Sequence, residues 1–214
     1  MLSDLLYSLK ETEFFFNLFG YISFRSGLSL VTSFFIVIIL MPHWIRFQKS
    51  IFPSGQPIRN DGPDTHYHKK GTPTLGGVLI LFSIILSSIL WTSNFSSFNY
   101  ILILTLTLFG LIGLVDDFQK VKLGKGISSK TKFLSQLLAT LIIYFTIKHN
   151  GFDLNKFSIP FLKDVSIELG YLYFVLILLI VVGSTNATNL TDGLDGLVSM
   201  PLIFVFLTFA IFAY

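Results

Sequence analysis

Two adjacent carboxylates, Asp116 and Asp117, directly follow the apolar run 109–115. An acid costs ~2.5 kcal/mol or more at the centre of a bilayer, and this cost falls toward the interface. Adjacent carboxylates also repel each other, so a nearby cation helps to keep both ionised. Hard cations such as Mg²⁺ take oxygen ligands and often share substrate phosphates, and neighbouring helical side chains diverge by ~100°. We therefore expect one acid to hold a metal while the other faces a second substrate; the alternative is a solvated helix end beside Lys120 and Lys122.

A second polar cluster recurs with a spacing of three residues. It consists of Asn186, Asn189, Asp192 and Asp195. In a helix this spacing keeps neighbours on one face, and amides and carboxylates together can read a nucleobase or sugar edge through hydrogen bonds. Gly193 and Gly196 should loosen such a helix and permit close approach of a ligand. The alternative interpretation is an ordinary polar turn between two membrane spans.

A third polar segment, residues 59–77, joins basic side chains to a turn rich in glycine and proline. Thr72 or Thr74 can cap the helix that we expect to follow. The N-terminus of a helix attracts phosphate, and Lys69 and Lys70 add point charges beside it. The alternative is a basic juxtamembrane loop that contacts anionic lipid.

Residues 124–131 loosely resemble a phosphate-binding P-loop but do not match its motif. The segment lacks the required Gly-Lys-[Ser/Thr] ending, and no strand is expected before it. We interpret it as a basic loop. Lys132, at the far edge of this loop, can still reach a phosphate.

The elements that must position these segments are apolar. Of the 214 residues, 52% are hydrophobic and only 13% are charged, against about 25% in soluble domains. This excludes a soluble globular domain, a disordered chain and a coiled coil, and the absence of cysteine excludes a disulfide framework or a cysteine nucleophile. A membrane helix needs ~20 apolar residues. We expect about six transmembrane helices, at about 26–44, 75–91, 98–115, 133–147, 169–188 and 194–214.

Basic residues mark alternate loops of this predicted all-α polytopic membrane bundle. The loops after the first and third helices contain Arg46, Lys49, Arg59, Lys69, Lys70, Lys120, Lys122, Lys125, Lys130 and Lys132. The loop at 148–170 has three bases, Lys148, Lys156 and Lys163. By the positive-inside rule the two basic loops are cytoplasmic and the N-terminus is outside. The segment 186–195 then shares their face, so three polar segments meet at the cytoplasmic mouth of one membrane domain, 1–214.

Four motifs resemble the phospho-N-acetylmuramoyl-pentapeptide transferase family of the polyprenyl-phosphate hexosamine-phosphate transferase superfamily. They are IRNDGP at 58–63, HKKGTPTLGG at 68–77, GLVDDF at 113–118 and NATNLTDGLDGL at 186–197. The first motif favours the muramoyl-pentapeptide branch over relatives that transfer N-acetylglucosamine phosphate. The resemblance implies a bacterial inner-membrane enzyme with a cytoplasmic active face. Undecaprenyl phosphate would attack UDP-N-acetylmuramoyl-pentapeptide with Mg²⁺, releasing UMP and forming the first lipid-linked peptidoglycan precursor.

The resemblance also implies roles for single residues. Asp116 and Asp117 would be the catalytic pair and part of the metal site; Asp116 would either deprotonate the lipid phosphate or help to handle the metal-bound diphosphate. The uridine-side, substrate-binding residues would be Asn186, Asn189, Asp192 and Asp195. Phosphate charge would be neutralised by Lys69, Lys70 and Lys132. A one-step and a two-step mechanism both stay open.

Members of this family are longer than the present chain. The resemblance implies a later aspartate that is a principal Mg²⁺ ligand and a histidine-rich cytoplasmic loop, both beyond Tyr214. We therefore expect the 214-residue chain alone to be a fragment or a split gene product with little or no activity. Competing hypotheses are a transporter or channel subunit, because intramembrane acids can mark ion paths, and a non-catalytic half of a split enzyme. The sequence leaves a homodimer open, and we expect no nucleic-acid partner.

Overall fold

The computed structural model describes residues 1–53, 55, 73–159, 162, 165–192 and 196–214. The regular elements of the described chain are helices apart from one short hairpin, which confirms the predicted all-α class. Its helices and strands are α1 (Leu2–Ser8), η1 (Leu9–Glu11), η2 (Phe14–Gly20), α2 (Ile22–Ile51), α3 (Gly76–Trp91), α4 (Ser97–Leu123), α5 (Ser129–His149), β1 (Lys156–Ser158), β2 (Ser166–Glu168), α6 (Leu172–Thr191) and α7 (Ser199–Ala213). The chain divides into two compact units, 1–135 and 136–214, and each is described by itself.

Each of the six predicted spans coincides with a helix for most of its length. Among the described helices, α2, α4 and α6 are long and apolar enough to cross a membrane, while α3 and α7 are apolar but shorter. The predicted fourth span, 133–147, lies within α5, which has Lys130 and Lys132 in its first turn and Lys148 in its last turn. The number of crossings and the orientation of the N-terminus stay predictions.

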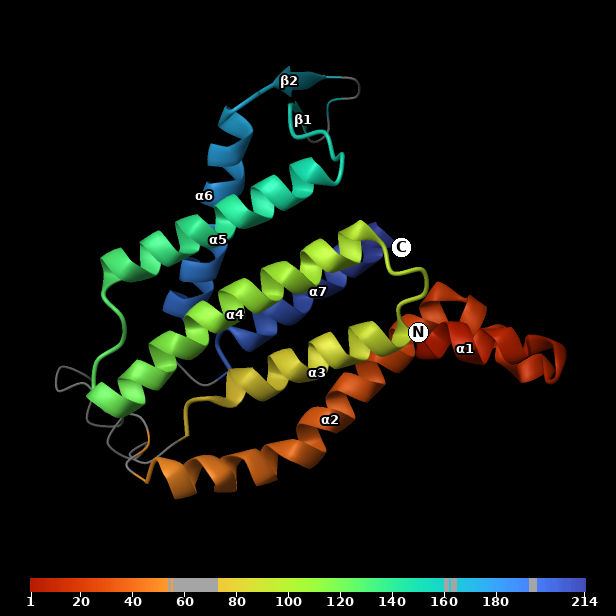
Figure 1. The fold of residues 1–214 in the computed structure, drawn as a ribbon, viewed down its shortest axis with the longest axis horizontal. Coiled ribbons are helices and arrows are strands. Elements are labelled where there is room, and N and C mark those ends of the chain that lie inside the picture. The colour runs from red at the N-terminus through yellow and green to blue at the C-terminus, as the bar shows by residue number, and fades with distance from the viewer. Residues whose placement is uncertain (54, 56–72, 160–161, 163–164, 193–195) are drawn as a thin grey trace. The chain divides into compact units, whose positions relative to one another are not determined.

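In the first unit, two tryptophans hold α2 against α3. The indole Nε1 of Trp91 donates to Thr32 Oγ1 at 2.9 Å, and that of Trp44 donates to the Leu75 carbonyl at 3.0 Å. Because residue 32 meets residue 91 and residue 44 meets residue 75, the two helices run antiparallel. Figure 1 shows α2 bent along its length, and Pro42 lies inside this helix, where proline removes a backbone hydrogen bond.

The turn between α3 and α4 lies where the polar run 91–98 predicts it. Ser96 starts α4 as its N-cap, and its backbone N–H and side-chain hydroxyl both donate to Asn99 Oδ1, at 3.1 and 2.7 Å. Gly124 ends the helix with φ of +74°, a left-handed conformation that favours glycine. The helix therefore continues eight residues past Val115, the predicted end of the third span.

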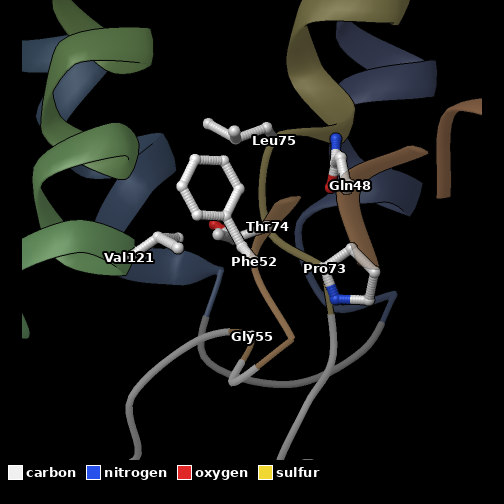
Figure 2. Close-up of a pocket in the computed structure, with 7 residues that line it drawn as sticks. All are labelled: Gln48, Phe52, Gly55, Pro73, Thr74, Leu75 and Val121. Carbon is white, nitrogen blue, oxygen red and sulfur yellow. The ribbon is translucent and has the colours of Figure 1, made fainter. Parts of the chain in front are cut away.

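The predicted threonine cap of α3 is wrong for Thr74, and Thr72 lies outside the described residues. The N-cap of α3 is Leu75, with no side-chain hydrogen bond. Thr74 instead lines a small cavity of about 10 Å³ together with Gln48, Phe52, Gly55, Pro73, Leu75 and Val121 (Figure 2). The side-chain Nε2 of Gln48, a residue only 5% exposed, has no hydrogen-bond partner within the described part of the chain. A cavity of this size holds at most one water molecule.

The second unit is built on α5 and α6. The buried side of α5 carries Gln136, Ala139, Thr140, Ile143 and Tyr144, whose spacing of three and four residues is that of one helical face. Tyr144 packs edge-on against Phe174 of α6, with ring centroids 5.3 Å apart. The predicted loop between these helices contains an unpredicted element, the antiparallel hairpin β1–β2, in which Lys156 faces Glu168.

Candidate active site

The continuation of α4 past Val115 places two acids and a lysine on consecutive turns of one helix. Lys120 Nζ lies 2.7 Å from Asp116 Oδ2 and 3.1 Å from Asp117 Oδ1. The spacings of three and four residues bring these side chains together on the helix surface. The two carboxylates, which we expected to diverge, thus each turn one oxygen toward a single ammonium group.

Asp116 is the more enclosed of the two acids, with only 6% of its surface exposed. Its Oδ1 accepts a hydrogen bond from the backbone N–H of Ile127 at 3.0 Å. Its Oδ2 is also approached by Lys132 Nζ, from α5, at 3.9 Å. A buried carboxylate needs such partners, because an unpaired buried charge is strongly destabilising. The loop 124–128 and the first turn of α5 therefore close over the end of α4.

Gly126 makes this closure sterically possible. A Cβ atom added at Gly126 would overlap Asp116 Oδ1 and would lie 3.1 Å from Lys120 Cε. The loop that we dismissed as a P-loop thus has a structural task, which is to bring one backbone N–H against the buried acid. The contact between this loop and Asp116 depends on a glycine at the point of close approach.

Asp116 and Asp117 supply some of the oxygen ligands that Mg²⁺ requires. Two carboxylate oxygens converge where Lys120 Nζ now lies, and Mg²⁺ is commonly bound by one or two carboxylates together with substrate phosphates. Within the described residues, no group of three or more His, Asp or Glu side chains gathers in one place. Asp116 and Asp117 therefore fit a metal that takes its remaining ligands from substrate, from water or from residues outside the described part.

Lys120 is the residue that sequence reasoning undervalued, since we treated it only as a neighbour of a solvated helix end. The available signal was its spacing from the acids, three and four residues toward the C-terminus, which is the favourable arrangement for a helical ion pair. We missed it because we ended the helix where the apolar run ends.

In the second unit, Asn186 is paired with a residue that we did not predict. Asn186 Nδ2 donates to Gln136 Oε1 at 3.0 Å, and Gln136 Nε2 donates back to Asn186 Oδ1 at 3.4 Å. Asn186 Nδ2 also donates to the Val182 carbonyl at 2.9 Å. These bonds fix the Asn186 amide between α5 and α6, so its described contacts are structural.

The other members of the second polar cluster differ from Asn186. Asn189 is exposed near the end of α6, and Asp192 is its C-cap, also exposed. Because α6 ends at Thr191, the predicted single helical face covers Asn186 and Asn189 but does not extend through Asp192. Gly196 has φ of +83°, a left-handed conformation that favours glycine. Asp195, Lys69 and Lys70 lie outside the described residues.

The structure thus brings together Asp116, Asp117 and Lys132 of the predicted site residues, all within the first unit. Asn186, Asn189 and Asp192 belong to the second unit. The meeting of the polar segments at one mouth of the bundle stays a prediction.

The region that contains these acids and amides matches a known family. Residues 99–214, more than half of the chain, match the model for glycosyl transferase family 4. The chain belongs to glycosyl transferase family 4. The match begins in the first turn of α4, so it includes Asp116, Asp117 and Lys120 as well as Asn186 and the end of α6.

Three curated relatives align with this chain along its whole length. It is 45% identical over 217 aligned residues to the phospho-N-acetylmuramoyl-pentapeptide-transferase of Desulforapulum autotrophicum, 41% to that of Desulfotalea psychrophila and 40% to that of Rickettsia prowazekii. Each alignment covers 100% of this chain and 60% of the relative. Together with its apolar helices, this similarity makes the chain a multi-pass membrane protein that spans part of the length of its relatives.

Proposed function

We propose that this chain belongs to a membrane enzyme that transfers phospho-N-acetylmuramoyl-pentapeptide from its UDP-linked form to undecaprenyl phosphate. The products are UMP and the first lipid-linked precursor of peptidoglycan. One observation carries the proposal: Asp116 and Asp117, inside the family 4 region, converge on one cation at the end of an apolar helix. Catalysis of phosphoryl transfer consists chiefly of positioning and of stabilising charge, which acids with a bound metal and lysines can supply together.

The two acids take different roles in this proposal. Asp116 is buried and already accepts from Ile127 N–H and Lys120, so it acts as the fixed member that sets the position of the pair. The side chain of Asp117 is 35% exposed and has one ion-pair contact, so it is the acid that can turn toward substrate. Lys120 and Lys132 supply positive charge for phosphate oxygens.

A divalent cation fits the same place. Asp116 and Asp117 would hold Mg²⁺ with substrate phosphates, and the metal would stabilise the negative charge that develops during phosphoryl transfer. Lys120, which lies between the two carboxylates, would then be displaced toward the phosphates. Lys132, whose Nζ lies 3.9 Å from Asp116 Oδ2, would keep its charge beside that acid.

The remaining residues complete the proposed substrate site. Asn189, Asp192 and Asp195 would bind the uridine side of the substrate, with Asn186 holding the local backbone through Gln136. Lys69 and Lys70 would contact the diphosphate. This arrangement requires the inner membrane of a bacterium, with the polar segments on the cytoplasmic face, because the nucleotide substrate is cytosolic. A homodimer is not part of the proposal.

Metal binding tests the proposal on the 214-residue chain itself. We would titrate Mn²⁺ into purified protein in detergent with UDP-N-acetylmuramoyl-pentapeptide and follow free Mn²⁺ by electron paramagnetic resonance. We expect Asp117→Asn to weaken nucleotide-dependent Mn²⁺ binding by about tenfold or more, since it removes a charged oxygen ligand. Glu168→Gln, at the exposed hairpin, is the matched control and should bind as the parent does.

The proposal is decided by comparing nucleotide-dependent Mn²⁺ binding in Asp117→Asn with that in Glu168→Gln and in the parent chain. Equal Mn²⁺ binding by the Asp117 variant and the parent chain would contradict the assignment of the acid pair. UMP release from the same preparation, measured with undecaprenyl phosphate and Mg²⁺, then shows whether the chain catalyses transfer. Release that disappears in Asp117→Asn and persists in Glu168→Gln supports the full reaction.

A further inference from the structure

The ammonium group of Lys120 occupies the place between the two carboxylates where a bridging cation would lie. Its Nζ is 2.7 Å from Asp116 Oδ2 and 3.1 Å from Asp117 Oδ1. Mg²⁺ binds carboxylate oxygens at about 2.0–2.1 Å. A metal that bridges these same two oxygens needs the space that the ammonium group fills, so the lysine and the metal exclude each other.

The loop that closes over the end of α4 also holds this lysine. A Cβ added at Gly126 would lie 3.1 Å from Lys120 Cε, so the backbone of the loop passes close to the aliphatic part of the side chain. Only 27% of the Lys120 side chain is exposed. The same loop donates the backbone N–H of Ile127 to Asp116 Oδ1. One segment therefore keeps the lysine and the buried acid together, in addition to their ion pair.

The charges of this cluster are already balanced. The two acids contribute two negative charges, and Lys120 contributes one positive charge. Lys132, whose Nζ lies 3.9 Å from Asp116 Oδ2, contributes the other. A divalent cation that enters alone must break the ion pairs of Lys120 or leave the cluster with an excess of positive charge. Both are unfavourable, because like charges repel and because a buried carboxylate loses its nearest partner.

A diphosphate removes both obstacles. Its oxygens accept hydrogen bonds from an ammonium group and bring the negative charge that balances a divalent cation. Once Lys120 turns toward a phosphate, the carboxylate oxygens are free for a metal that also shares phosphate oxygens. Lys132 stays beside Asp116, so the buried acid keeps a positive neighbour.

We infer that Lys120 is a positioning residue that keeps the acid pair closed to divalent cations until a diphosphate binds. The inference rests on the proposed function and specifies how metal and nucleotide binding are coupled at that site. The diphosphate draws Lys120 away from the acids, and the metal frees Lys120 for the diphosphate. Each ligand therefore strengthens the binding of the other, and by the same factor.

Binding of Mn²⁺ without nucleotide tests this role on the 214-residue chain in detergent, with free Mn²⁺ followed by electron paramagnetic resonance. Lys120→Gln keeps a hydrogen-bond donor beside the acids and removes the charge, so Mn²⁺ alone should bind about tenfold more tightly than to the parent chain. A merely structural role for Lys120 predicts weaker binding. Added UDP-N-acetylmuramoyl-pentapeptide should strengthen Mn²⁺ binding by a factor about ten times smaller in this variant than in the parent.

Two other lysines provide matched controls. Lys122→Gln removes the same charge from the same end of α4, where the Lys122 ammonium group lies 6.0 Å from the centroid of the Phe118 ring, and it should bind Mn²⁺ as the parent does. Lys132→Gln removes a charge near Asp116 that does not lie between the acids. It should change the Mn²⁺ affinity by less than about threefold.

The charge-retaining variant Lys120→Arg keeps the inference testable if Lys120→Gln does not fold. Its guanidinium group can pair with both carboxylates, so Mn²⁺ alone should bind no more tightly than to the parent chain. Tighter binding would overturn the inference.

Other results would contradict the role of Lys120. Unchanged or weaker binding of Mn²⁺ alone by folded Lys120→Gln would reject it, and an equal gain in Lys132→Gln would assign the effect to net charge. Nucleotide-dependent Mn²⁺ binding that is lost in Asp117→Asn, without a gain in Lys120→Gln, would reject this role and keep the proposed function. Absence of both effects would reject the two together.

Discussion

Gly126→Ala is expected to break the contact between the loop 124–128 and the buried acid of α4. A Cβ at this position would overlap Asp116 Oδ1, and Lys120 Cε at 3.1 Å blocks part of the space around it. Either the carboxylate or the loop must move. The bond from Ile127 N–H to Oδ1 is 3.0 Å long, so a further few tenths of an ångström take it beyond the usual limit of 3.2 Å.

The magnitude follows from the type of bond that is lost. A hydrogen bond to a charged group contributes about 1.5–3 kcal/mol, which corresponds to a factor of about 10 to 150 in an equilibrium constant. We therefore expect the amide of Ile127 to exchange with deuterium about 10 to 150 times faster in Gly126→Ala than in the parent chain, after correction for intrinsic exchange. Amides in the middle of α4 should keep their rates.

Hydrogen–deuterium exchange of the peptide that contains Ile127 measures this change. Gly113→Ala is the matched control, because a Cβ at Gly113 meets nothing within 4 Å and alanine favours the helix over glycine. Unchanged exchange at Ile127 in Gly126→Ala would refute the steric argument. Equal acceleration in both variants would indicate general loosening of α4 and would refute it as well.

Five further substitutions probe other contacts through the free energy of unfolding in mixed micelles. Gln136→Leu should cost about 1–3 kcal/mol, because Asn186 loses its amide partner, and a cycle with Asn186→Leu should show coupling of about 0.5–3 kcal/mol. Trp91→Phe should cost about 0.5–1.5 kcal/mol through the lost indole hydrogen bond to α2. Lys120→Met should cost about 1–3 kcal/mol and Lys132→Met less than about 1 kcal/mol, since their ammonium groups lie 2.7 and 3.9 Å from the buried carboxylate.

Each of these has its own contrary result. Additive free energies in the Gln136 and Asn186 cycle would show that the amides are not coupled. A Thr32→Val variant that loses nothing, when Trp91→Phe does, would assign the loss to packing. A larger cost for Lys132→Met than for Lys120→Met would reverse the order of the two ion pairs.

The positions of the helices could be read from the chain because hydropathy and length are local properties. The six apolar stretches each fall largely within a helix, and the polar run 91–98 separates α3 from α4. The residues at which the helices begin and end were harder to predict from the sequence. Hydropathy marks where a helix should leave the bilayer, whereas backbone hydrogen bonding continues until a residue such as Gly124 adopts a left-handed conformation. The cap of α3 and the hairpin β1–β2 were missed for the same reason, since both depend on local backbone geometry.

The sequence by itself determined that Asp116 and Asp117 stand at the end of an apolar segment with lysines near them. Residue type and order are enough for this, because they set where charged side chains can lie relative to the apolar core of a membrane. Only the tertiary structure decided which groups meet Asp116. The left-handed turn at Gly124 reverses the chain, the missing Cβ of Gly126 admits the loop, and α5 then presents Lys132. Such contacts depend on chain reversal and on close packing, which no pattern of residue types specifies.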